Sequence, residues 1–343
     1  MKIATLFSGV GSPEFGAKRV YRKVKNVFAC EIDKFARQSY LANHDIDEEH
    51  FYKDIYELDA TKYRGKVDVL VGGSPCQSFS IAGLRKGIND KRGELIYEFI
   101  RVLDEVKPPI FIYENVRGFT SIDGGRTFKQ FQEALRKIGY FIHSDILNTK
   151  DYGVPQNRER VYITGFLDSE VYYSFNYAPK QKLAKKLADI LENDVDDKYY
   201  VNREIKNYKS QANTIHDINK FSSTICAGSH GYALGYIKVA GSVDIKSNDS
   251  NKRVYSIDGI APTITTMQGG HQEPKILRKS KIRKLTPREC LRLQDFPDTF
   301  KFVCSDSQIY KQAGNSMSVN ILEMIFRQIE KAKNKELKKE TLF

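Results

Sequence analysis

Apolar and polar residues alternate along the first half of the chain in blocks that predict a repeated strand–helix pattern. Short apolar runs are typical of buried strands and occur at residues 3–7, 24–30, 67–73, 109–116, 141–147 and 160–166. Helices are predicted between them, beginning near Pro13 with Ser12 as N-cap, beginning at Asp33, and covering residues 93–106 and 127–137. This alternation predicts a mostly parallel sheet with helices on both faces and with ligands at the carboxyl ends of its strands.

The pattern changes after about residue 180. A helix is predicted over residues 185–200, and from there to about residue 280 the chain is rich in Gly, Ser, Asn and Thr with short strand-like runs. Strong signals return afterwards, at residues 283–297, at residues 312–317 and in a closing helix over residues 319–331. We therefore expect a smaller, irregular, β-rich domain inserted before the first domain is complete.

The composition is that of a globular protein with an excess of positive charge. Lys and Arg number 55 against 43 Asp and Glu, which gives a formal net charge of +12. A basic excess favours a polyanionic partner because each neutralised phosphate releases a counterion, although charge that serves only solubility explains it equally well. No apolar run approaches the ~20 residues that span a bilayer, and no signal peptide is evident. The five cysteines form no C-x-x-C pair, so we expect an intracellular, reducing location.

Candidate ligand-binding residues follow the first predicted strands. The turn F-S-G-V-G at residues 7–11 contains glycines that let the backbone approach a ligand. The dinucleotide fingerprint would need glycine where Glu14 stands, which disfavours a nicotinamide cofactor and favours a nucleoside without a pyrophosphate. Glu31 lies about 20 residues further on and can accept hydrogen bonds from ribose hydroxyls. Asp54 is placed to accept from an adenine amino group, or is an ordinary loop carboxylate.

Cys76 is the candidate nucleophile. It follows a buried strand and lies next to a proline in a loop, where a thiol is exposed, whereas a structural cysteine is usually buried among apolar neighbours. Glu114 ends the next predicted strand, and Arg158 and Arg160 lead into a later one. Each of these residues alone could be a surface charge, but together and in this order they predict one reactive site.

This order of motifs resembles the DNA (cytosine-5)-methyltransferases, in particular the compact bacterial enzymes of restriction-modification systems. The shared motifs are F-x-G-x-G at 7–11, Glu31, Asp54, P-C-Q at 75–77, E-N-V at 114–116, Q-x-R-x-R at 156–160, RKLTPREC at 283–290 and Q-x-G-N-S at 312–316. The match covers nearly the whole chain. The part that lacks a family-wide pattern, about residues 185–280, is where such enzymes carry their target recognition domain.

The resemblance implies a Rossmann-like, S-adenosylmethionine-dependent methyltransferase fold of the α/β class. It places the catalytic, cofactor-binding domain at residues 1–182 and 310–343, and the target recognition domain at 183–309 with a connecting hinge over about 281–309. S-adenosylmethionine, without a metal, would contact Phe7, Gly9, Gly11, Glu31, Ile32, Asp54, Ile55, Leu95 and Asn315. Two departures are Ser12-Pro13, where relatives often have Gly-Gly, and Ile32, where some relatives have an aromatic residue that stacks on adenine.

The resemblance also implies a covalent mechanism. Cys76 would add to C6 of a flipped-out cytosine so that C5 can attack the methyl group. Glu114 would hydrogen-bond N3 and the exocyclic amine and donate a proton, which requires a raised pKa, while Arg158 and Arg160 would orient the base. Contacts to DNA are expected from Gln77, Ser80, Arg92 and Thr263.

The partner implied by the resemblance is double-stranded DNA, bound by a monomer in the bacterial cytoplasm at the nucleoid, with a functionally linked restriction endonuclease. Two alternatives remain. The first is a tRNA cytosine-5 methyltransferase, since one eukaryotic branch of the family acts on tRNA; the long insert at 185–280 argues against it. The second is a DNA-binding homologue without catalysis, against which the intact Cys76, Glu114, Arg158 and Arg160 argue.

Overall fold

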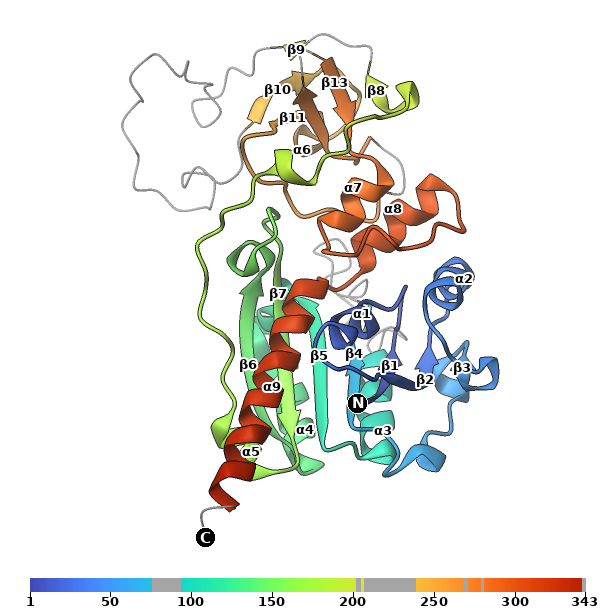
Figure 1. The fold of residues 1–343 in the computed structure, drawn as a ribbon, viewed down its shortest axis with the longest axis vertical. Coiled ribbons are helices and arrows are strands. Elements are labelled where there is room, and N and C mark those ends of the chain that lie inside the picture. Colours follow the sequence, from blue (N-terminus) through green and yellow to red (C-terminus); the bar gives the residue numbers. More distant parts are fainter. Residues whose placement is uncertain (76–93, 202–204, 207–238, 268–270, 279–280, 341–343) are drawn as a thin grey trace.

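The computed structural model describes residues 1–75, 94–201, 205–206, 239–267, 271–278 and 281–340, which form a larger α/β part and a smaller β part (Figure 1). The larger part contains a seven-stranded sheet in the order β3-β2-β1-β4-β5-β7-β6. Its strands are β1 Lys2–Leu6, β2 Lys25–Cys30, β3 Phe51–Tyr52, β4 Val69–Gly72, β5 Ile110–Val116, β6 Phe141–Asn148 and β7 Glu159–Phe166.

Six of these strands are the six apolar runs of the sequence, so the predicted sheet is confirmed. Strands β1 to β5 pair in parallel, whereas β7 runs antiparallel to both β5 and β6. The central strand β4 shows why the runs are continuous: Val69, Leu70 and Val71 are all 0% exposed, because both faces of the sheet are covered.

Helices cover both faces of the sheet. These are α1 Ser12–Lys18, α2 Lys34–Asn43, α3 Glu94–Val106, α4 Arg126–Lys137, α5 Ser169–Ser174 and α9 Val319–Glu340. One face packs against α3 and α4, for example through Phe99 and Leu135. The other packs against α1, α5 and the C-terminal α9, for example through Ala17 and Phe326, and Figure 1 shows α9 crossing this face. The last helix of the chain therefore completes the first domain.

Two predicted helix starts had different outcomes. Asp33 is confirmed as the N-cap of α2, because its Oδ1 accepts the backbone N–H groups of Phe35 and Ala36 at 2.9 and 3.0 Å. The prediction that Ser12 caps α1 was wrong. Ser12 is the first helical residue, and the cap is Gly11, whose φ of 86° lies in the left-handed region. Glycine reaches this conformation without the steric cost that a Cβ would impose.

The smaller part contains a six-stranded sheet in the order β8-β13-β12-β11-β10-β9. Its strands are β8 Tyr200–Val201, β9 Ile205–Lys206, β10 Val239–Val243, β11 Arg253–Ser256, β12 Lys275–Arg278 and β13 Lys281–Lys284, and nearby helices are α6 Asp249–Lys252, α7 Pro287–Arg292 and α8 Asp306–Asn315. Its own core is small, with Val243, Ile245, Val254 and Ile282 buried. A separate cluster joins the two parts, since Val10 and Ala36 pack with residues of α7 and α8.

The helix predicted over residues 185–200 was wrong. The structure has only two short 3-10 turns there, Leu187–Ile190 and Asp197–Tyr199. The backbone N–H groups of Leu187 and Ala188 donate to the carbonyls of Gly259 and Ile257, each at 2.8 Å. Tertiary backbone partners and the buried Leu187 side chain therefore outweigh the local helical pattern.

A buried ion pair within the RKLTPREC segment joins β13 of the second sheet to α7. Arg283 of β13 donates to both oxygens of Glu289 in α7, at 2.7 and 2.6 Å, and the two side chains are 1% and 0% exposed. Glu289 also accepts the backbone N–H groups of Thr286 and Glu192. These bonds satisfy the buried carboxylate, as a buried charge requires.

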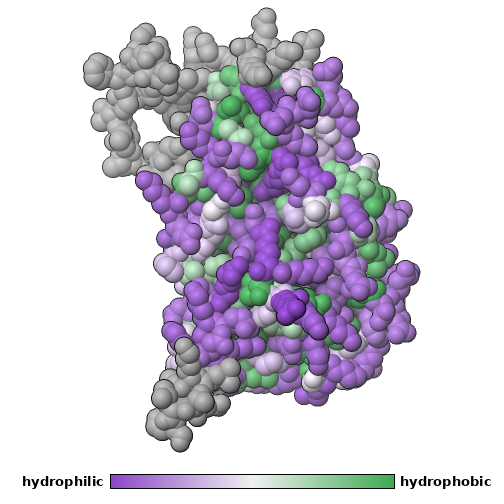
Figure 2. All heavy atoms as spheres, in the orientation of Figure 1, coloured by the Kyte–Doolittle hydropathy of each residue, from purple (hydrophilic) through white to green (hydrophobic). Residues whose placement is uncertain are grey.

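The surface drawn in Figure 2 is mostly hydrophilic, as the charged content of the sequence leads one to expect. None of the helices in the described part of the chain has both the length and the apolar character of a membrane-spanning helix.

Candidate active site

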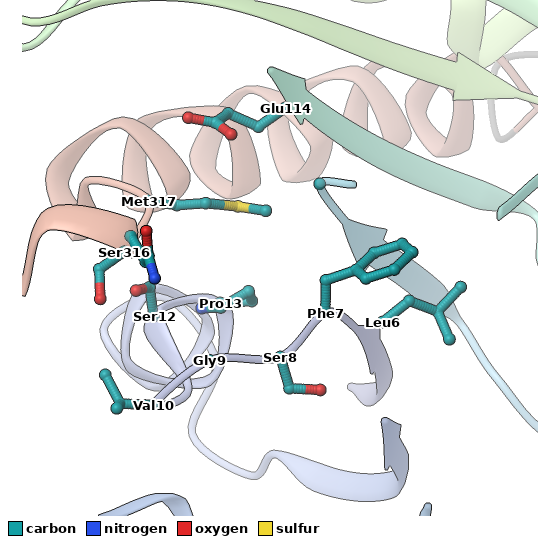
Figure 3. Close-up of a pocket in the computed structure, with 12 residues that line it drawn as sticks. Leu6, Phe7, Ser8, Gly9, Val10, Ser12, Pro13, Glu114, Ser316 and Met317 are labelled. Carbon is teal, nitrogen blue, oxygen red and sulfur yellow. The ribbon is translucent and has the colours of Figure 1, made fainter. Parts of the chain in front are cut away.

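A pocket with an empty volume of about 370 Å³ lies at the carboxyl ends of β1, β4 and β5. It is lined by residues 6–10, Ser12, Gly73, Glu114 and residues 315–317, together with Pro13. Figure 3 shows Glu114 and Met317 on one side of the pocket and the turn after β1 on the other. This is the edge of a parallel sheet at which ligands are expected to bind.

The two glycines of the turn after β1 have different surroundings. A Cβ built on Gly9 has no heavy atom of the described residues within 4 Å, so this backbone faces open space in the pocket. A Cβ built on Gly11 would lie 2.1 Å from Nε2 of His44, which itself contacts the Val10 carbonyl at 3.1 Å. Gly9 therefore leaves room for a ligand, whereas Gly11 leaves room for a buried histidine.

Glu31 follows β2 and is bonded to this turn. Its Oε2 accepts the Gly9 N–H and its Oε1 accepts the Asp33 N–H, both at 2.8 Å. A carboxylate oxygen has two lone pairs, so each oxygen keeps one for a ligand hydroxyl. Burial raises the pKa of Glu31, although the two backbone bonds oppose that effect. The adjacent Ile32 is 74% exposed, as an apolar contact for a flat ring would need.

Asp54, Ile55 and Leu95, also predicted to contact the cofactor, lie outside the pocket lining, as do Gly11, Glu31 and Ile32. Asp54 accepts the Tyr56 N–H at 3.0 Å and caps the short turn Ile55–Glu57. Ile55 is 4% exposed in the main core, and its carbonyl accepts a bond from Arg101 at 2.8 Å. Leu95 is half-buried against the same core. The side chains of Ile55 and Leu95 therefore pack in the main core.

Glu114 is the buried acid of the pocket. Nε of Arg160 lies 3.3 Å from Oε1 of Glu114, and the two side chains are 16% and 12% exposed. Burial raises the pKa of Glu114, whereas the charges of Arg160 and Arg158 act to lower it, and burial is the larger effect. The raised pKa that an acid role for Glu114 requires is therefore present.

The chain leading from β4 toward Cys76 packs tightly on β5. A Cβ on Gly73 would lie 2.7 Å from the Glu114 carbonyl oxygen, so only glycine allows this approach. Ser74 Oγ lies 2.7 Å from the Tyr113 hydroxyl, and Asn115 Nδ2 donates to the same hydroxyl at 2.9 Å. This buried network fixes the start of the loop. Cys76, Gln77, Ser80 and Arg92 lie outside the described residues.

Arg158 and Arg160 differ in their contacts. Arg158 is 2% exposed and donates to three backbone carbonyls, those of Ile264 at 3.3 Å, Gly314 at 3.1 Å and Ser316 at 2.9 Å. Burial lowers the pKa of Arg158 to about 9. Arg160 thus contacts Glu114, whereas Arg158 connects backbone segments. Thr263, predicted as a DNA contact, donates its hydroxyl to the Asn157 carbonyl at 2.6 Å.

The C-terminal part of the chain closes the pocket. Asn315, the last residue of α8, is exposed and lines it, as do Ser316 and Met317. Lys311 of α8 donates to Asp33 at 2.6 Å, which ties this helix to the start of α2. Sequence reasoning missed Gly73 and Met317, which lie just outside the P-C-Q and Q-x-G-N-S motifs and whose side chains carry no obvious chemistry.

Comparison with known proteins adds to this geometry. The sequence model of the family "C-5 cytosine-specific DNA methylase" matches residues 1–331. The type II methyltransferase M.NlaX of Neisseria lactamica is 36% identical, with 96% of each chain covered. The orphan methyltransferase M.SPBetaI of Bacillus phage SPbeta is 31% identical, with 96% of this chain and 97% of the relative covered. The solved structure of Entamoeba histolytica methyltransferase EhMeth shares the fold, with a TM-score of 0.70 at 17% identity over 96% of this chain and 97% of that one.

Proposed function

Because the chain belongs to the C-5 cytosine-specific DNA methylase family, and is a DNA cytosine methyltransferase, we propose that it methylates a flipped-out cytosine through a covalent bond from Cys76. The methyl donor in this proposal is S-adenosylmethionine. The observation that carries the proposal is the contact of Arg160 with Glu114, a pocket residue that lies beside the chain leading to Cys76.

The pocket suits a nucleoside-type methyl donor. It opens at the carboxyl ends of parallel strands, where ligands of this fold class bind, and glycine backbone lies on one side of it. Phe7, Gly9 and Asn315 line it, and Glu31 has lone pairs for ribose hydroxyls. We assign Ile32 and Asp54 to the adenine end, and Gly11, Ile55 and Leu95 to the packing that shapes these contacts. Bound S-adenosylmethionine supplies an electrophilic methyl group.

The chain's own groups carry the remaining chemistry. The Cys76 thiolate forms a bond to C6 of the cytosine, and neutral Glu114 gives its proton to N3, so that electron density collects at C5. Arg160 holds the Glu114 carboxyl group and orients the base, and Arg158 supports this arrangement. After C5 has gained the methyl group, a water molecule accepts the C5 proton, the electrons of that C–H bond form the C5–C6 double bond, and the C6–sulfur bond breaks to release the Cys76 thiolate. The Glu114 carboxylate then recovers the proton from N3.

We propose that residues 183–309, with a hinge over 281–309, recognise a specific duplex sequence, and that residues 1–182 and 310–343 catalyse the transfer. The second sheet lies within the first of these ranges. Gln77, Ser80, Arg92 and Thr263 remain the proposed DNA contacts, and the Thr263 hydroxyl oxygen can still accept a bond while it donates to Asn157. The proposed setting is the bacterial nucleoid in the cytoplasm, where the enzyme acts as a monomer functionally linked to a restriction endonuclease.

The alternatives fit less well. Both curated relatives named above are described as type II or orphan methyltransferases, and the matching family is named for DNA, which favours DNA over tRNA as substrate. A homologue without catalysis would have no use for a buried acid with a raised pKa beside an arginine.

Transfer of labelled methyl groups to duplex DNA and to tRNA tests the substrate, and bisulfite sequencing then locates the modified cytosine. A duplex with 5-fluorocytosine at that position tests the mechanism, since fluorine cannot leave as the C5 proton does. We expect a gel-stable adduct with the native enzyme and none with Cys76→Ala. Methyl transfer to tRNA but not to duplex DNA would contradict the proposal. So would an equal amount of gel-stable adduct from Cys76→Ala and from the native enzyme.

A further inference from the structure

Residues 261–265, which we call the anchor segment, connect the smaller part of the structure to the chain that precedes β7. The Ala261 N–H donates to the Pro155 carbonyl at 2.8 Å, and the Asn157 N–H donates to the Ala261 carbonyl at 3.0 Å. The Thr263 hydroxyl donates to Asn157 as well. The anchor segment is therefore bonded to the same stretch of chain that carries Arg158 and Arg160.

Gly314 allows the anchor segment to touch α8. A Cβ at Gly314 would lie 2.1 Å from the Thr265 carbonyl oxygen and 2.4 Å from its carbon, and 2.7 Å from the Thr266 nitrogen. These are backbone atoms, so no side-chain rotation could relieve the clash. Gly314 is helical and lies outside the left-handed region, where alanine would otherwise be the better helix former. The close approach of Thr265 is thus what requires glycine here.

Arg158 binds both sides of this contact. Its guanidinium donates to Ile264 of the anchor segment and to the carbonyls of Gly314 and Ser316, which flank Asn315. Asn315 and Ser316 line the pocket. One buried cation therefore fixes the pocket residue Asn315 relative to the anchor segment, and Arg160, two residues further along the chain in β7, contacts Glu114.

We propose that Gly314 is a positioning residue, which with Arg158 couples cofactor binding at the pocket to DNA binding at the smaller part of the structure. The inference rests on the proposed function. Contact of the cofactor with Asn315 fixes the position of the end of α8. Because Gly314 packs against Thr265, this also fixes the position of the anchor segment. By linkage, DNA then tightens cofactor binding by the same factor by which cofactor tightens DNA binding.

The test measures the affinity of the full chain for S-adenosylhomocysteine with and without a duplex that it methylates. For the native protein we expect the duplex to improve this affinity by about 5-fold or more, within the usual range of allosteric coupling. We call the affinity with the duplex divided by the affinity without it the coupling ratio. In Gly314→Ala the coupling ratio should fall toward one, while the affinity for S-adenosylhomocysteine alone changes by less than about threefold. Gly118→Ala is the matched control, because its Cβ would meet only a Val116 methyl group at 3.9 Å among the described residues.

Arg158→Lys provides a second variant if Gly314→Ala does not fold. Lysine keeps the charge, but a single ammonium cannot reproduce the planar fork that reaches three carbonyls. We expect the ratio of the affinities with and without the duplex to fall toward one in this variant as well. Circular dichroism checks that the variant is folded. A ratio of one in the native protein, or an unchanged ratio in a folded variant, overturns the inference. If the native protein neither binds S-adenosylhomocysteine nor transfers methyl groups, the proposed function itself has failed.

Discussion

Arg160 and Glu114 meet across two neighbouring antiparallel strands, with Nε of Arg160 3.3 Å from Oε1 of Glu114. Arg160 pairs with Val116, which lies two residues beyond Glu114, so both side chains project from the same face of the sheet. Burial favours the neutral acid and Arg160 favours the carboxylate. Burial and the neighbouring arginine therefore act on the pKa of Glu114 in opposite directions, and burial is the larger effect.

Replacing Arg160 by Gln should change the pH dependence of methyl transfer. In the proposed mechanism neutral Glu114 donates the proton, so we expect activity to be lost as the pH rises through the pKa of Glu114. Removing a cation that favours the carboxylate raises this pKa, and the alkaline limb of the single-turnover rate should move to higher pH. The maximal rate should also fall about 10- to 100-fold, for a lost bond to a charged group worth about 1.5–3 kcal/mol.

Arg117→Gln is the control for this experiment. Arg117 also pairs with a glutamate, Glu159, at 2.6 Å, but its side chain is 64% exposed. Its loss should leave the pH profile in place. An alkaline limb that stays fixed in Arg160→Gln, or moves to lower pH, would contradict the role given to Glu114.

Replacing Glu31 by Gln should weaken cofactor binding. Both carboxylate oxygens accept backbone N–H groups, whereas glutamine has one oxygen, and its NH₂ group would face a second donor. The dissociation constant for S-adenosylhomocysteine, measured by calorimetry, should rise about 10- to 100-fold. Glu48→Gln, at an exposed position, should bind normally. Unchanged affinity in Glu31→Gln would show that the Glu31 carboxylate only stabilises the turn after β1 and does not bind the cofactor.

Alanine at Gly11 should mainly lower stability, whereas alanine at Gly9 should mainly weaken binding. At Gly11 the left-handed φ costs about 1–2 kcal/mol and the clash with His44 about 1–3 kcal/mol more, so urea unfolding should show a loss of about 2–5 kcal/mol. At Gly9 only the first cost applies, but the new methyl group enters the pocket and should weaken cofactor binding. Adding His44→Ala to Gly11→Ala should restore part of the stability. Equal losses at both glycines would refute the distinction.

Replacing Glu289 by Gln should destabilise the second sheet. The change leaves the Arg283 charge, which is 1% exposed, without its partner. Breaking a buried ion pair by removing one partner costs about 3–5 kcal/mol, which equilibrium denaturation would detect. Arg327→Gln, part of an exposed pair with Glu323, should cost less than about 1 kcal/mol. A similar cost for both changes would mean that the buried pair contributes no more than a surface pair.

Exchanging residues 185–280 for those of a relative with a different target should change which sequence is methylated. The exchange carries most of the second sheet and leaves Glu114, Arg160 and Asn315 in place. Bisulfite sequencing of DNA from cells that express the chimera would read the outcome. An active chimera that still methylates the original sequence would show that recognition lies elsewhere.

The elements that the sequence predicted correctly are those in which local chemistry and tertiary packing agree. Strand β4 is apolar because it is buried on both faces, and Asp33 caps α2 with atoms only two and three residues away. The helix predicted over residues 185–200 was wrong because the backbone of this segment bonds to Ile257 and Gly259, which lie far along the chain. Short β3 was missed because two residues carry no periodic signal.

The same reasoning applies to the site. The order of the motifs predicted one site for Cys76, Glu114, Arg158 and Arg160, and in the structure Arg160 contacts Glu114. The contacts of Arg158 with Ile264 and Gly314 join residues more than a hundred positions apart, which no local pattern encodes. Likewise, the need for glycine at position 314 depends on Thr265, and becomes visible only when both backbones are in place.

The position of α9 has a consequence for synthesis of the protein in the cell. Its residues Leu322, Ile325 and Phe326 are fully buried against the sheet, yet they leave the ribosome after every strand they cover. At about 5–20 residues per second, the stretch between β7 and α9 takes on the order of ten seconds to make. Throughout that interval one apolar face of the nascent sheet is open to chaperones and to other chains. The yield of folded enzyme therefore depends on whether α9 is completed before aggregation begins.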